Sequence, residues 1–210
     1  MDITWYGHAC FRLKSREGTV ITDPYDKSLG LTPPSVKADV VTVSHNALHH
    51  NNTKVAKGAY VINGPGEYEV NGVFVTGVHI PPTKNAKEAA RNNVFVIYLD
   101  DIAICHLGDL SHVPTQKQVE EMGNIDVLLV PVGGQNALKA AQAAEVVSLI
   151  EPYIVIPMHY KLPSITLKLD PVSKFLTEMG ITKTETVESL KLTKASLPEE
   201  TQVIVMDPRV

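Results

Sequence analysis

The chain has 210 residues, a formal net charge of −4 and a pI near 6.0, so no basic field would concentrate a long nucleic acid or an anionic membrane surface. This length suits one large domain with a buried core, and we expect a single domain over residues 1–210. Two cysteines, Cys10 and Cys105, are too few for a disulfide framework.

The beginning of the sequence gives no sign of an export signal. Residues 1–5 do not form a basic region followed by an apolar stretch, and no segment approaches 18 uninterrupted apolar residues. We therefore expect an unprocessed cytoplasmic protein that does not enter membranes.

Short β-branched or alternating segments fill the first part of the chain, separated by Gly, Pro, Asn and Asp. This spacing is typical of strands joined by tight turns, of which Asn71-Gly72 is the clearest. A short helix is expected over 49–57. The predicted strands are 2–6, 9–14, 18–23, 39–44, 59–62, 67–70 and 73–78.

The segment 79–93 has weak strand signals and is expected to be a long loop. Lys84, Lys87 and Arg91 stand there against Glu88, which gives a local net charge of +2. Such a loop would be a positive flap that draws a small anionic substrate, or an ordinary solvated loop.

From residue 94 strands alternate with helices. Pro114 and Pro171 suit the first turn of two of these helices, and a third is rich in alanine. Two sheets packed face to face with helices outside would bury such runs, which predicts an α+β sandwich of the αββα type. The predicted strands are 94–99, 102–106, 126–131, 153–157 and 202–206, and the helices are 114–122, 136–150 and 170–179.

Metal-competent side chains follow three of these strands. His45, His49 and His50 follow the strand 39–44, Asp109 follows 102–106, and His159 follows 153–157. Imidazole is the commonest metal ligand, and ligands that converge from several strand ends are held rigidly. The sequence therefore predicts a metal site at this edge of the sheets.

Glycines next to these residues bear on the same prediction. Gly108 permits the backbone bend that would turn the carboxylate of Asp109 inward. Gly133-Gly134 follows the strand 126–131 and either lines the site through bare backbone or forms an ordinary tight turn. His106 is expected to be structural, and His112 to belong to the entry of a helix.

A family resemblance emerges from the order of five blocks. Together they resemble the metallo-β-lactamase-fold hydrolases, and most closely the short branch similar to ascorbate-phosphate lactonases. The resemblance covers nearly the whole chain. The blocks are Trp5-Tyr6-Gly7-His8, Thr22-Asp23-Pro24, Ser44-His45 to His50, Gly108-Asp109 and Pro157-Met158-His159-Tyr160.

The resemblance implies an αββα sandwich with one or two metal ions at a sheet edge and a metal-activated water as nucleophile. The family's first motif is His-x-His-x-Asp-His, and its outer histidines fall on His45 and His50. Ala47 stands where a histidine belongs and His49 where an aspartate belongs. A further family histidine corresponds best to His79. The first metal position is thus depleted, and the second keeps His50, Asp109 and His159, with His49 beside them.

These residues predict a zinc- or manganese-dependent hydrolase of a small ester, lactone or phosphodiester, with an atypical or incomplete metal site. Asp109 is expected to act as ligand and orienter, and His8 in substrate contact or proton transfer, although a core or turn histidine is the alternative for His8. A catalytically inactive scaffold that binds a ligand or a protein is the competing hypothesis, because of Ala47. We expect a small, anionic substrate, no long nucleic acid, and an exposed sheet edge or the 79–93 loop that could support a homo-oligomer.

Overall fold

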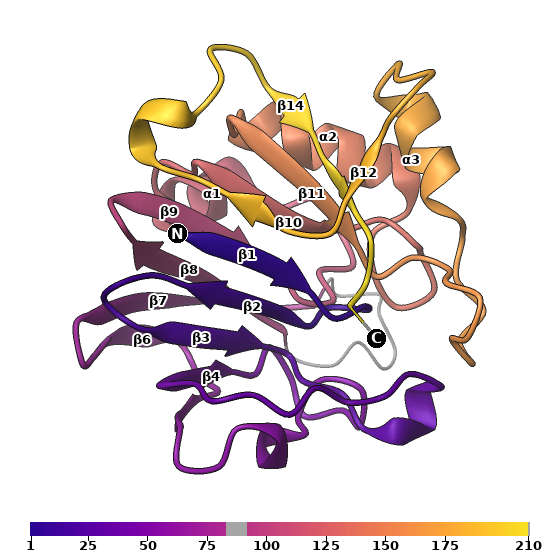
Figure 1. Ribbon diagram of the computed structural model, residues 1–210. Coiled ribbons are helices and arrows are strands. Elements are labelled where there is room, and N and C mark those ends of the chain that lie inside the picture. The colour runs from indigo at the N-terminus through magenta and orange to yellow at the C-terminus, as the bar shows by residue number, and fades with distance from the viewer. Residues whose placement is uncertain (83–91, 210) are drawn as a thin grey trace.

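Two mixed β-sheets stacked face to face form the centre of the molecule (Figure 1). The computed structural model describes residues 1–82 and 92–209. Within them the first sheet has the order β13-β1-β2-β3-β4-β5 and the second β14-β11-β10-β9-β8-β7-β6, with a separate pair β12-β15. Antiparallel and parallel pairs occur in both sheets, so the predicted α+β sandwich is confirmed.

The strands form where the sequence alternates or is rich in β-branched residues. The first sheet contains β1 (Asp2–Trp5), β2 (Phe11–Lys14), β3 (Thr19–Thr22), β4 (Val40–Thr42), β5 (Tyr60–Ile62) and β13 (Leu190–Lys191). The second contains β6 (Gly66–Val70), β7 (Val73–Ile80), β8 (Asn92–Leu99), β9 (Ile102–His106), β10 (Val127–Pro131), β11 (Ile154–Met158) and β14 (Gln202–Val203). The separate pair is β12 (Thr186–Val187) and β15 (Val205–Met206).

The inner faces of the sheets make the core. Ile3, Leu13, Val20 and Val40 are aligned across β1 to β4, and all four are fully buried. Burying such a side chain stabilises the fold by roughly 1.5–3 kcal/mol. The stacked sheets therefore hold the residues that directly follow the strand ends in fixed positions.

Three α-helices follow strands of the second sheet: α1 (Gln116–Met122), α2 (Ala140–Ile150) and α3 (Val172–Glu178). Helix α2 packs on β10 and on α3, and Figure 1 shows these helices on the side of β10 and β11 away from β1. On the side of the first sheet the described residues include the 3₁₀ helices η1 (Lys27–Leu29) and η2 (Thr53–Val55). A third 3₁₀ helix, η3 (Lys194–Ser196), comes between β13 and β14 in the sequence.

Several predicted boundaries are wrong, and local hydrogen bonds explain them. The expected helix 49–57 shrinks to η2, because the side-chain amides of Asn51 and Asn52 bond to Asn46 and to the Tyr25 carbonyl instead. Helix α2 starts at Ala140, because the Gly134 N–H donates to the Leu138 carbonyl and closes a turn before it.

The other two helices begin after their prolines. Pro114 precedes the Thr115 cap of α1, whose side chain accepts from the Gln118 N–H, and Pro171 is itself the N-cap of α3. The predicted strand 202–206 is two strands, because β14 pairs with β11 and β15 with β12.

The four successive strands β6, β7, β8 and β9 pair antiparallel, each with the next. Asn71 and Gly72 have φ of 52° and 86°, which confirms the predicted turn between β6 and β7. The expected loop 79–93 is partly strand, because His79 pairs with Asn93 and Ile80 with Asn92. The charged part expected to form a flap, from Lys84 to Arg91, lies outside the described residues. In the described parts of the chain, no helix has the length and apolar character needed to cross a bilayer.

Candidate metal centre

Strand ends from both sheets meet at one place. Asp23 follows β3, His45 and His50 follow β4, Asp109 follows β9, and His159 follows β11. Because β3 and β4 are parallel, as are β9, β10 and β11, the carboxyl ends of these strands lie at the same edge. The loop after β1 adds His8, whose carbonyl accepts the His159 N–H at 3.1 Å and so joins the two sheets.

The polar atoms of this cluster lie at ligand-to-ligand distances. His8 Nε2 is 3.1 Å from His50 Nε2, which is 3.3 Å from Asp109 Oδ2. The other oxygen of Asp109 lies 3.3 Å from His159 Nε2, and His45 Nε2 is 3.7 Å from Oδ2. Two ligands of a tetrahedral zinc ion with bonds of about 2.0 Å are roughly 3.3 Å apart.

Asp23 holds His50 from behind. Its carboxylate is fully buried and accepts hydrogen bonds from the Ser44 N–H at 2.7 Å, from the Ser44 hydroxyl at 2.5 Å and from His50 Nδ1 at 2.9 Å. Since a carboxylate only accepts, the proton of His50 sits on Nδ1, and Nε2 faces Asp109 and His8. A carboxylate behind an imidazole is the arrangement that orients metal-binding histidines.

Burial and neighbouring charges shift the pKa values of the clustered residues. Burial opposes protonation of His50, but Asp109 and Asp23 outweigh it and raise its pKa to about 10. Burial also disfavours the carboxylate of Asp109, yet His159 and His50 hold its pKa well below the usual range. Burial, followed by His159 and His50, keeps the pKa of His8 well below its ordinary value. A cation between the two carboxylates is therefore favoured, and a metal ion can take the place of the second proton.

Local backbone conformation aims these side chains inward. His8, Asp23 and His159 have φ of 53°, 36° and 52°, in the left-handed region that non-glycine residues rarely adopt. Gly108 has φ of 58°, as its predicted bend requires, and a Cβ there would lie 2.5 Å from both Asn92 Oδ1 and Ser44 Cβ. The bend lets the Asp109 N–H donate to Asn92 Oδ1 at 2.9 Å.

The donor set fits a metal ion. His8, His50 and His159 each offer a ring nitrogen within 4.8 Å of the others, and Asp109 Oδ1 is buried without a hydrogen-bond partner in the described structure. A second group, Asp23 with His45 and His50, also satisfies this distance. Because the Asp23 carboxylate is already taken by Ser44 and His50, we assign it to orientation and the first group, with Asp109, to the metal.

The structure brings most of the predicted site residues together, but not all of them. His45, His50, Asp109 and His159 come together as the sequence predicts. His8, expected in substrate contact or proton transfer, lies among them, with Nε2 3.1 Å from His50 Nε2. His49 stays at the margin, with its ring centroid 6.2 Å from that of His8. The structure does not bring His79 into the cluster, because it lies on β7 with Nδ1 3.3 Å from Asn93 Oδ1.

Sequence reasoning missed the role of Asp23 and Ser44. Both belong to blocks that carry the family resemblance, but a carboxylate 27 positions before His50 gives no spacing pattern of its own. The signal that could have found Asp23 is its place directly after a buried strand. His106 is structural, as expected: it is fully buried, and its Nε2 donates to the Ala9 carbonyl at 2.8 Å.

Comparisons with known proteins identify the family of this chain. The model of the β-lactamase superfamily domain matches residues 2–159. A UPF0173 protein of Pyrococcus abyssi is 28% identical over 186 residues, which cover 76% of this chain and 83% of the relative. A UPF0173 metal-dependent hydrolase of Salinibacter ruber is 24% identical over 214 residues, covering 86% and 94%.

Solved structures extend the similarity to the whole chain. A proposed Zn-dependent hydrolase of the metallo-β-lactamase superfamily from Thermotoga maritima is 43% identical, covers 98% of this chain and 97% of its own, and superimposes with a TM-score of 0.81.

Proposed function

Because this chain belongs to the metallo-β-lactamase superfamily of metal-dependent hydrolases, we propose that it hydrolyses a small ester, lactone or phosphodiester at a single metal position. The convergence of His50, Asp109 and His159 at 3.3 Å separations is the observation that carries the proposal. His8 completes the donor set. Zinc suits three imidazoles and one carboxylate, and manganese is the alternative.

When bound, such an ion supplies a hydroxide nucleophile near neutral pH and polarises the scissile oxygen. The chain's own residues fix the geometry. Asp23 locks the ring of His50 through Nδ1, and Asp109 spans His50 and His159 with its two oxygens. Asp109 is therefore a ligand and orienter, not a free base, and His8 is committed to the donor set through Nε2.

A small substrate is supported by the space beside the cluster. A cavity of about 430 Å³ next to His45 is lined chiefly by neutral polar residues, among them Asn46, Asn51 and Asn63. This volume lies at the small end of ligand pockets. Amide side chains donate and accept hydrogen bonds, which suits the carbonyl or hydroxyl groups of an ester or lactone.

The proposal is tested by metal content and hydrolysis together. Protein purified without added metal is analysed by mass spectrometry for metal per chain, and is then assayed with zinc or manganese on chromogenic esters, lactones and bis-phosphodiesters. We expect about one equivalent of metal and hydrolysis that a chelator abolishes. Asp109→Asn and His159→Ala should lose both, whereas His112→Ala, which lies outside the cluster, should lose neither.

A scaffold that has lost catalysis is the second candidate, favoured by Ala47 and His49 at two positions of the family motif. Stoichiometric metal without hydrolysis of any substrate in the panel would favour it. Ala47→His separates the cases further. If only a ligand is missing, the variant gains metal occupancy beyond one equivalent, because His45 already lies 3.7 Å from Asp109 Oδ2.

A further inference from the structure

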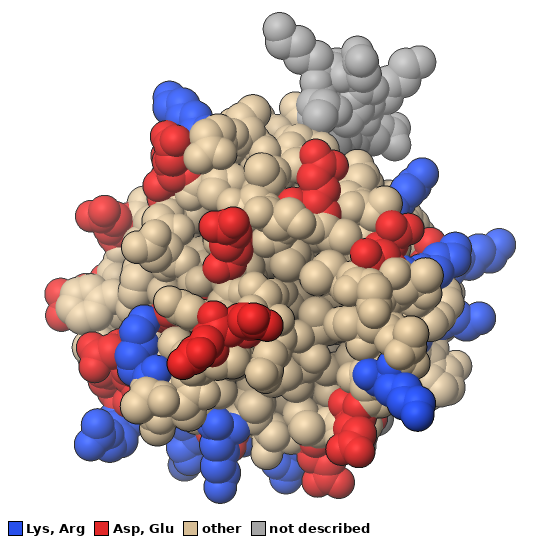
Figure 2. Space-filling model, turned by 90° about the horizontal axis from the view of Figure 1, so that it is seen from above, with Lys and Arg blue, Asp and Glu red and all other residues tan. Residues whose placement is uncertain are grey.

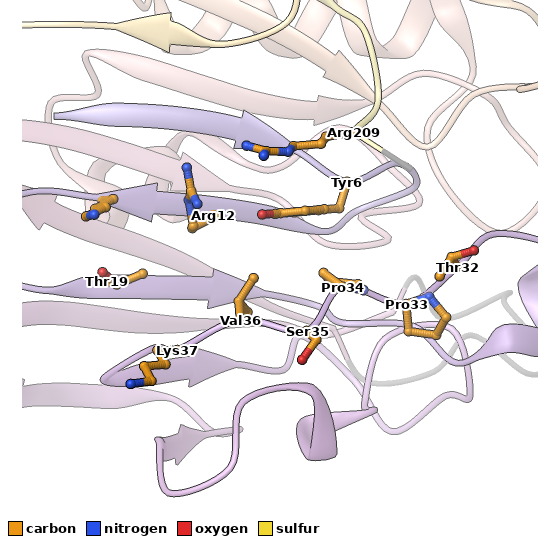
Figure 3. A pocket seen from close by; sticks show the side chains of 11 residues that line it. Tyr6, Arg12, Thr19, Thr32, Pro33, Pro34, Ser35, Val36, Lys37 and Arg209 are labelled. Atoms are coloured by element: carbon orange, nitrogen blue, oxygen red, sulfur yellow. The ribbon is translucent and has the colours of Figure 1, made fainter.

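We propose that the outer face of the first sheet carries a second binding site, separate from the metal centre, for a phosphorylated small molecule of nucleotide size. A cavity of about 650 Å³ opens there (Figure 3). Its floor comes from β2 and β3 and from Tyr6 after β1, one wall from residues 32–37, and another from Arg209. The metal-centre residues do not contribute to its lining.

The charge of this cavity is the first argument. Four cationic side chains line it, Arg12, Lys14, Lys37 and Arg209, whereas no Asp or Glu in the described parts of the chain does. A chain with a net charge of −4 thus gathers four cationic side chains around one hollow, of which Arg12 is paired with Asp2 at 3.3 Å. On the face seen in Figure 2, in contrast, acidic side chains lie among the basic ones. Clustered like charges repel one another unless an anion lies between them.

Arg12, on the floor of the cavity, has a fixed position. Arg12 is tied by one end of its guanidinium to Thr4 Oγ1 at 3.0 Å and to Asp2 at 3.3 Å. These two contacts hold the guanidinium of Arg12 in place on the floor of the cavity before any ligand binds.

The walls are fixed before any ligand arrives. The buried hydroxyl of Tyr25 donates to the Tyr6 carbonyl at 2.6 Å and lies 3.1 Å from the Thr32 carbonyl. This side chain therefore ties the floor of the cavity to the wall formed by residues 32–37. The backbone N–H of Arg209 donates to the Trp5 carbonyl at 2.8 Å, which anchors the wall formed by Arg209. A preformed site spends little binding free energy on ordering its own residues.

The lining defines the class of ligand. Guanidinium groups bind phosphate oxygens in pairs, and in Figure 3 Arg12 and Arg209 approach each other near the Tyr6 hydroxyl. Tyr6, Pro33 and Pro34 add apolar surface for a ring. A volume of about 650 Å³ suits a nucleoside diphosphate better than a polymer.

Isothermal titration of the full chain with ADP and with pyrophosphate tests the proposal, in excess EDTA so that the metal centre contributes no anion binding. We expect a Kd below about 1 mM for ADP and weaker binding of pyrophosphate. Lys37→Gln and Arg209→Gln, both exposed, should each weaken ADP binding about tenfold. Lys57→Gln removes an exposed lysine outside the cavity and should leave the affinity unchanged.

The same experiment has outcomes that overturn the proposal. His159→Ala damages the metal centre, so loss of ADP binding in that variant but not in Lys37→Gln would place the anion at the metal centre. No heat with either ligand would exclude the site. Binding of a single-stranded RNA in preference to ADP would exclude a small ligand. Retained ADP affinity in His159→Ala supports the site even if this protein shows no hydrolase activity.

Discussion

At the scale of single residues, the metal centre depends on backbone conformations that carry a cost. His8, Asp23 and His159 all have positive φ, and each such non-glycine residue costs on the order of 1–3 kcal/mol. The surrounding hydrogen bonds hold them there: the His8 carbonyl accepts from the His159 N–H and also from Trp5 Nε1. The fold thus gives up stability to aim His8 and His159 at the metal position and to set Asp23 behind His50.

Asp23 offers the sharpest residue-scale test of orientation. Asp23→Asn keeps the shape of the side chain but removes the charge that fixes the Nδ1 proton of His50. Loss of such a partner typically weakens metal binding about 10- to 100-fold. We expect that loss in competition titrations of zinc against a chelating dye, with the circular dichroism spectrum unchanged.

Asp101→Asn is the matched control, because Asp101 is exposed and its φ of 61° is one that asparagine also tolerates. Equal zinc affinity in Asp23→Asn and Asp101→Asn would show that Asp23 does not orient His50.

His106 predicts a pH dependence of stability. Burial lowers its pKa, and its ring is kept neutral because Nε2 donates to Ala9 while Nδ1 accepts from the Gly108 N–H at 3.2 Å. Below about pH 6.5 the unfolded chain binds a proton that the folded chain excludes, so stability falls as pH falls, by up to roughly 1.4 kcal/mol per unit.

Urea unfolding of the wild type and of His106→Gln in EDTA measures this contribution. The variant should be less stable at pH 7 but should lose about 1–2 kcal/mol less between pH 7 and pH 5. Parallel pH profiles would contradict the assignment.

Much of the metal centre was predictable at this scale, because a polar residue directly after a buried strand is visible in the sequence. His45, Asp109 and His159 closely follow a strand end, whereas His50 lies further along the loop after β4 and was placed by the family motif. The rule does not say which side chains orient others, so Asp23 was missed. The family resemblance placed His79 just after a strand, whereas β7 continues to Ile80 and holds His79 within the sheet.

At the scale of elements, Gly133 shows how closely the ends of β10 and β11 approach. A Cβ on Gly133 would lie 2.1 Å from the His159 carbonyl oxygen and 3.0 Å from Tyr160 Cα, so the glycine is required by close packing behind the metal centre. Of the two alternatives for Gly133-Gly134, the turn is present, because Gly134 has φ of 68° and its N–H donates to the Leu138 carbonyl.

Gly133→Ala should displace His159 and weaken zinc binding at least tenfold, with a loss of stability of about 1–3 kcal/mol from overpacking. Gly64→Ala controls for a glycine substitution without crowding, because Gly64 is not in the left-handed region and a Cβ there meets only Tyr68 Oη, at 3.7 Å. Zinc affinity that is unchanged in Gly133→Ala would mean that β10 can shift without moving His159.

The existence of most elements was predictable, but their ends were not. Runs of β-branched residues identify strands because such side chains pack well on the face of a sheet that is buried in the core. The ends depend on caps and turns such as Thr115 or the Gly134–Leu138 turn, which form through particular hydrogen bonds. The strands β12 and β13 are only two residues long and exist because a partner strand lies beside them, which composition does not reveal.

At the scale of the whole molecule, the metal should act as a clamp between the sheets. His8 and His50 come from the first sheet, and Asp109 and His159 from the second. An ion that binds only the folded chain stabilises it by about 4 kcal/mol when its concentration is 1,000 times Kd. We therefore expect zinc to raise the urea midpoint of the wild type.

His159→Ala should show no zinc-dependent change in midpoint, since the second sheet then lacks one of its two donors. An equal increase in both proteins would indicate that zinc stabilises the fold from somewhere else.

The hydrogen bond between His159 N–H and the His8 carbonyl also has a consequence for biosynthesis. During translation His8, His45 and His50 leave the ribosome long before β11 exists, so the early chain exposes histidines without the partners that complete the centre. Closing this contact requires pairing between distant parts of the sequence, which is slow compared with local folding. The complete donor set for a metal ion therefore exists only once β11 has paired with β10 and brought His159 to the other three residues.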